Sequence, residues 1–126
     1  YTSHEPNSQK NPLDPWITGL PTTGDFIGVM SNSEEMTDDI MFHADSVDIP
    51  VVGLHLPMSV LSNENLLRSD HYNFWKNKLD AAIYTDTAEF RNPHYHKKSD
   101  TPDTLNYRFM SQVADLILEI IKASRP

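Results

Sequence analysis

Three short apolar segments constrain the fold of this chain more than any other feature of its sequence. They cover residues 26–30, 49–57 and 81–85, and they are continuous apolar runs, not alternations of apolar and polar residues. Such runs are typical of strands in a sheet that is covered on both faces. We expect strands at 26–30, 51–56 and 81–85. Helical patterns separate and follow these strands, so the sequence predicts an α/β layered fold.

Three helices are expected, over residues 33–45, 70–79 and 104–123. Asn32 is the predicted N-cap of the first helix and places Glu35 in its first turn, where an acidic side chain is favoured. The last helix is the most regular, because apolar residues recur at helical spacing from Leu105 to Ile121. Pro102 and Asp103 suit its first turn or its cap. The fold therefore has about three strands and three helices.

The composition excludes several classes of protein. The chain has 126 residues, which suits one domain, with no cysteine and a net charge of −8. The acidic balance argues against a nucleic-acid partner or an anionic membrane surface, because both require a basic patch. Without cysteine there are no disulfides, thiolate zinc ligands or cysteine nucleophiles. No apolar run approaches the roughly 18 residues of a membrane-spanning helix, and no signal peptide is visible, although the chain opens on Tyr1 without a methionine.

Residues 1–24 are rich in proline, with Pro6, Pro12, Pro15 and Pro21. Proline at this density predicts extended loop and excludes a helix. A loop of this length is unusual inside a compact domain. We therefore expect either a functional loop or a segment whose packing partner is missing from the chain.

The polar loop of residues 91–101 holds the strongest candidates for chemistry. His94 and His96 flank Tyr95, and Asp100 follows four residues after His96. Imidazole is the commonest metal ligand in proteins, and loops at the carboxyl ends of strands carry the sites of α/β sheets. The simpler interpretation is that both histidines are solvated and that Asp100 caps the last helix. The spacing alone favours the simpler interpretation.

Asp70 and His71 form a second cluster, directly before an aromatic helix. An adjacent aspartate and histidine can orient each other or a metal ligand. On spacing alone, a helix cap at Ser69 or Asp70 is the better interpretation. The neighbouring acids Glu34 and Glu35 are interpreted as the first turn of a helix and not as a catalytic pair.

Several sequence blocks recur together in one known family. The blocks are Pro21–Ile27, Ser31-Asn32, Ser69-Asp70-His71, Phe74-Trp75, Thr85–His96 and Ser99–Leu105. In order and spacing they resemble the C-terminal half of the bacterial zinc aminopeptidases, which are metallopeptidases of family twenty-eight and relatives of glutaminyl-peptide cyclase. The resemblance covers nearly the whole chain, and its most specific block is Arg91–His96 with the Ser-Asp-Thr that follows. It implies a partial three-layer α/β/α domain of the zinc-exopeptidase type.

The resemblance also implies roles for individual residues in a two-zinc site that removes N-terminal residues from peptides. His96 matches a zinc ligand of the family. Tyr95 matches the side chain that polarises the scissile carbonyl and stabilises the oxyanion. Asp70 and His71 match positions near the substrate pocket and behind the ligands. Asp100 is expected to support the His96 loop or to cap the following helix.

The family's other zinc ligands and its general base have no counterpart in this sequence. The pair Glu34-Glu35 lies in a different context from the family's catalytic pair, so no base is assigned to it. A catalytic zinc needs about three protein ligands. We therefore expect residues 1–126 to be the C-terminal portion of an aminopeptidase domain, inactive by itself, with weak or absent zinc binding. His94 is expected to add an adventitious contact beside His96, since residues two apart share a strand face.

Two other functions stay open at this point. One is a noncatalytic module that binds a partner or completes a second chain, and the other is a fragment of a cyclotransferase similar to glutaminyl cyclase. The resemblance suggests a secreted or periplasmic location and a peptide substrate. Because the strands of the family's N-terminal half are missing, an exposed sheet edge is expected to let copies of the chain associate.

Overall fold

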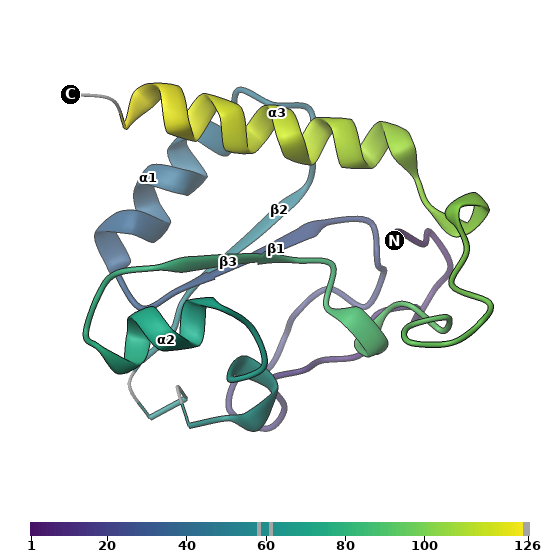
Figure 1. The fold of residues 1–126 in the computed structure, drawn as a ribbon, viewed down its shortest axis with the longest axis horizontal. Coiled ribbons are helices and arrows are strands. Elements are labelled where there is room, and N and C mark those ends of the chain that lie inside the picture. Colours follow the sequence, from purple (N-terminus) through teal and green to yellow (C-terminus); the bar gives the residue numbers. More distant parts are fainter. Residues whose placement is uncertain (58, 61, 125–126) are drawn as a thin grey trace.

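The structure, a computed structural model, describes residues 1–57, 59–60 and 62–124 (Figure 1). Within these ranges the chain forms one small sheet and three α-helices, which confirms the predicted mixed α/β fold. The elements in chain order are β1 (Ile27–Ser31), α1 (Glu34–Ala44), β2 (Val51–His55), α2 (His71–Lys76), β3 (Ala82–Thr85) and α3 (Tyr107–Ala123). None of the helices in these described ranges is long and apolar enough to cross a membrane.

The sheet has the strand order β2-β1-β3, so β1 is the central strand. All five residues of β1 are buried, whereas most positions of β2 and β3 are only partly buried. β1 runs parallel to β2 and antiparallel to β3, with Thr85 opposite Gly28. The loop that follows β3 therefore leaves the sheet at the end where β1 and β2 begin. The polar loop does follow a strand, as expected. It lies at the end of the sheet where the two parallel strands begin, not at the end where their carboxyl ends lie.

Two apolar clusters cover the two faces of this sheet. On one face lie α1 and α3 (Figure 1), with Ala44, Phe109 and Leu116 in the buried cluster. On the other face α2 and the proline-rich segment pack together, and Leu13 and Trp75 join Met30 there. The two clusters give a three-layer arrangement in which irregular chain forms much of one outer layer.

The proline-rich segment is packed against the rest of the chain. Leu13 is fully buried in the second of these clusters. The segment also folds back on itself through backbone hydrogen bonds, from Ser3 N to Gly24 O and from Gln9 N to Thr22 O. The suggestion that its packing partner is missing was therefore wrong, because the segment packs on the face of the sheet that also carries α2, which is the lower face in Figure 1.

The N-cap of α1 differs from the predicted one. The side chain of Ser33, not that of Asn32, accepts the hydrogen bond from Met36 N. Asn32 instead joins the turn before β3, since its side chain accepts from Ala81 N at 3.0 Å and donates to Leu79 O at 3.1 Å. A cross-link to a segment 49 residues away outcompetes the local cap, and the sequence pattern does not reveal that choice.

The other helices are shorter than expected at their ends. α3 begins after Asn106, whose side chain accepts from Phe109 N at 3.0 Å. Residues 102–104 form a separate 3₁₀ turn, and Leu105 is extended, so neither Asp100 nor Asp103 caps this helix. α2 ends at Lys76, and Lys78 has a left-handed φ of 59°, which a continuing helix excludes.

We propose that the isolated chain self-associates. Within the described residues, the outer edges of β2 and β3 pair with no other strand, and unpaired edges favour pairing with another chain. Exposed apolar side chains such as Phe42 and Phe74 add to this tendency. Sedimentation should show a mass that rises with concentration in the micromolar range. Added salt should strengthen association, because it screens the net charge of −8. A concentration-independent monomer with a cooperative melt at high temperature would contradict the proposal.

Candidate active site

An open cleft of about 250 Å³ lies on the lower face of the sheet. The sheet contributes Met30 and Ile83 to its floor, and the segment before α2 contributes Leu66 and Arg68. The cleft thus combines an apolar floor with polar walls, as small-molecule sites do.

Tyr95 lines this cleft, and His96 lies beside it. The Tyr95 ring is half-buried and the His96 ring is exposed. Their ring centroids are 3.9 Å apart and the planes are inclined by 16°, so the two side chains stack. His96 has a φ of 56°, in the left-handed region. The stacked pair consists of the two residues for which the family resemblance implied the oxyanion and zinc-ligand roles.

His71 also lines the cleft. Its ring is buried, and its Nε2 lies 2.7 Å from Leu66 O. A neutral imidazole with the proton on Nε2 can donate this bond, which leaves Nδ1 as an acceptor. Nδ1 is buried without a hydrogen-bond partner among the described residues. Burial is the largest cause of a lowered pKa at His71, opposed by the bond to Leu66 O and by the charge of Asp70.

The other predicted site residues lie outside the cleft. Asp70 is the first residue before α2, as a cap would be, but its side chain makes no capping bond. Asp100 is exposed, and its backbone N–H donates to Lys97 O. His94 Nδ1 lies 3.1 Å from Ser99 Oγ. The backbone here forms turns and not a strand, so the premise that His94 and His96 share a strand face was wrong.

An ion pair that the sequence pattern did not indicate lies beside the cleft. Arg68 lines the cleft, and its guanidinium donates two parallel bonds to the Glu89 carboxylate, at 2.5 and 2.8 Å. This hydrogen bonding is the main cause that raises the pKa of Arg68 and lowers the pKa of Glu89; the charge of His96 also lowers the pKa of Glu89. Both side chains are nearly half exposed, so the pair adds little stability. It does fix the orientation of Arg68 at the cleft wall.

The donors of the site do not form a complete metal centre. Among the described residues, no three His, Cys, Asp or Glu side chains converge as metal ligands. His96 is exposed beside the cleft, and the His71 ring that lines it is buried, so among the described residues the two imidazoles are not joined by a third ligand. What the chain assembles is a cleft with a phenol hydroxyl and an adjacent imidazole at its edge.

Comparison with known proteins gives two matches. The family model described as peptidase family M28 matches residues 29–121. A protein of Escherichia coli (strain K12), described as the uncharacterized protein YfbL, is 32% identical over 128 residues, which is 99% of this chain and 39% of that protein. The chain therefore spans about two fifths of the length of this curated relative. No solved structure matches significantly.

The buried His71 predicts a pH-dependent stability. Its pKa lies below the ordinary 6.5 in the folded chain, so between the two values the unfolded chain binds more protons. The contribution of His71 to stability is complete above about pH 6.5 and decreases as the pH falls toward the folded pKa. Denaturant midpoints between about pH 5.5 and 8 should show this loss, because most carboxylates stay ionised there.

The variant His71→Gln should flatten this part of the pH profile, because it removes the buried titrating ring. His55→Gln is the matched control, since His55 is an exposed histidine at the end of β2. An unchanged slope in His71→Gln would show that another group causes the pH dependence.

Proposed function

The chain belongs to peptidase family M28, and from this premise we propose that it is the C-terminal part of a zinc-dependent aminopeptidase domain. The observation that carries the proposal is the pairing of Tyr95, inside the cleft, with the exposed His96 ring stacked against it. This arrangement leaves an imidazole free at the rim and a phenol hydroxyl beside it. The substrate would be a peptide whose N-terminal side chain enters the cleft.

In this proposal Tyr95 acts on the reacting carbonyl. Its hydroxyl is a hydrogen-bond donor, and a donor aimed at the developing negative charge lowers the barrier to acyl transfer. The neutral His71 and Arg68, whose guanidinium is held by Glu89, line the cleft in which the substrate would lie. His96 supplies one protein ligand to the metal, which would polarise the carbonyl and activate water in the intact enzyme.

The described residues do not fit a zinc centre by themselves. A catalytic zinc needs about three protein ligands, and no such group is present among them. The proposal therefore requires that the other ligands and the general base come from a part of the enzyme outside these 126 residues. It follows that this chain alone does not hydrolyse peptides.

The isolated chain is expected to bind zinc weakly. A single imidazole is a poor zinc site, and Ser99 already contacts the neighbouring imidazole of His94. Calorimetric titration with zinc near neutral pH should give a dissociation constant in the micromolar range or weaker. Binding in the nanomolar range would show that the chain holds a complete site and would contradict the proposed division of ligands.

In the intact protein, two substitutions should separate metal binding from chemistry. His96→Ala should lower zinc occupancy and peptidase activity together. Tyr95→Phe should keep the zinc and lower kcat by about 10²-fold or more, which is the usual cost of one oxyanion donor. Zinc content and the release of N-terminal residues from unblocked peptides are the measurements.

The matched controls are His55→Ala and Tyr107→Phe. His55 is exposed on β2, and Tyr107 is exposed at the start of α3. Both variants should keep full activity and full zinc content. A fully active Tyr95→Phe would refute the oxyanion role, and cyclisation of N-terminal glutamine without hydrolysis would assign the site to a cyclotransferase.

A further inference from the structure

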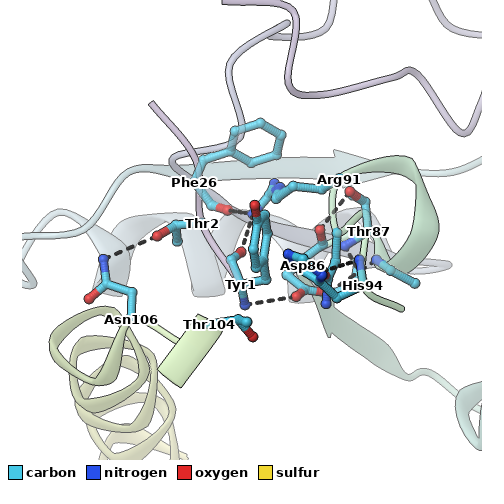
Figure 2. Close-up of polar contacts among 12 residues, drawn as sticks. Tyr1, Thr2, Phe26, Asp86, Thr87, Arg91, His94, Thr104 and Asn106 are labelled. Atoms are coloured by element: carbon cyan, nitrogen blue, oxygen red, sulfur yellow. Dashed lines mark hydrogen bonds and ion pairs between the residues drawn. The ribbon is translucent and has the colours of Figure 1, made fainter. Parts of the chain in front are cut away.

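Arg91 is a buried cation directly before the loop that carries Tyr95 and His96. Its side chain is only 4% exposed. Figure 2 shows its hydrogen bond to the carbonyl of Phe26, the residue before β1, at 2.6 Å from Nη1. The guanidinium carbon also lies 4.5 Å from the centre of the Phe26 ring. The start of the site loop is therefore held against the start of the central strand.

Gln9 holds the same guanidinium from the proline-rich segment. Its Oε1 accepts from Arg91 Nε at 2.7 Å and from Thr87 Oγ1 at 2.9 Å. One residue further on, Lys10 N donates to Phe90 O at 2.8 Å. Two consecutive residues of the proline-rich segment thus bind two consecutive residues of the other segment. Gln9 binds the Arg91 side chain, and Lys10 binds the Phe90 carbonyl.

The space around the Arg91 stem is shaped for it. A Cβ atom at Gly24 would lie 2.8 Å from both Cγ and Cδ of Arg91. Only glycine allows so close an approach without a shift of the arginine stem. The absence of a side chain at Gly24 thus leaves room for the Arg91 stem in its observed position.

Asn92 links Arg91 to the turn that contains Tyr95 and His96. It is buried, and its side-chain oxygen accepts from His94 N at 2.9 Å. Its backbone oxygen accepts from Tyr95 N at 3.2 Å, and its own N–H donates to Ala88 O. The turn that presents Tyr95 is therefore built on the residue that follows Arg91.

We infer that Arg91 is a positioning residue that fixes Tyr95 and His96 through its bonds to Phe26 and Gln9. This inference rests on the proposed peptidase function, and it goes beyond the residues that contact substrate or metal. The alternative is that Arg91 only stabilises the fold.

A guanidinium suits this position better than other side chains. Its planar fork donates from Nε and Nη1 to two acceptors in a fixed geometry, whereas a lysine ammonium is a single point on a flexible stem. Burial lowers the pKa of Arg91, and the charges of Asp86 and Asp25 oppose that effect. Nη2 is buried without an acceptor among the described residues. An unpaired buried donor lowers the stability of the fold, so stability alone does not explain an arginine at this position.

The test uses three variants of the intact protein and one control. Arg91→Met removes both donors, Arg91→Lys keeps the charge with a single donor group, and Gly24→Ala keeps the arginine but displaces its stem. Arg108→Met is the control, because Arg108 is an exposed arginine on α3. The measurements are kcat and KM for peptide hydrolysis and hydrogen exchange of the backbone amides of residues 92–98.

We expect Arg91→Met to lower kcat by about 10²-fold, the scale of a small misplacement of catalytic groups, with KM changed by less than about threefold. Exchange should rise in residues 92–98 and stay unchanged in α3. Arg91→Lys and Gly24→Ala should show smaller losses of the same kind, and Arg108→Met should show none.

The inference is overturned if Arg91→Met keeps kcat within about twofold of the wild type, or if its exchange rises equally over the whole fold, as a purely structural role predicts. An unstable Arg91→Met variant leaves Gly24→Ala to decide, since an unchanged kcat and unchanged exchange in that variant also overturn the inference. A wild-type protein without peptidase activity would refute the proposed function instead. The exchange of residues 92–98 would then still decide whether Arg91 positions the loop.

Discussion

The pairing of β1 with one strand on each side is the constraint on which the rest of this structure depends. All five residues of β1 are buried, so each face needs a cover and each edge needs a partner. β2 meets this need in parallel and β3 in the opposite direction. The reversal of β3 brings the chain after Thr85 to the beginning of β1. There it packs against the proline-rich segment. Contacts between these two segments bury Arg91 and hold the chain just before the turn that contains Tyr95.

Most of the fold could be predicted from the sequence, because its signals are local. Continuous apolar runs marked all three strands, and helical periodicity marked α3 to within a few residues. Tyr95 and His96 were proposed as site residues from a sequence block of a known family, and their roles stay predictions. The direction of β3 was not predictable in this way, since a short apolar run reads the same in a parallel or an antiparallel strand.

The interactions that organise the site were missed for a related physical reason. Arg68 and Glu89 are 21 residues apart, and Arg91 and Gln9 are 82 residues apart. Such pairs form only when the tertiary fold brings their segments together, and they carry no periodic pattern. The cap of α1 shows the same competition on a smaller scale, because a distant contact took Asn32 and left the cap to Ser33.

The backbone at His96 has a consequence for how this loop can change over evolution. Its φ of 56° is accessible to glycine and, among residues with a Cβ, mainly to asparagine, aspartate and histidine. A relative can therefore carry asparagine, aspartate or glycine in place of this histidine and keep the shape of the loop. Replacement by valine or isoleucine would strain the backbone as well as remove the imidazole. The residue at this position in a relative therefore indicates whether its loop can adopt the backbone conformation described here.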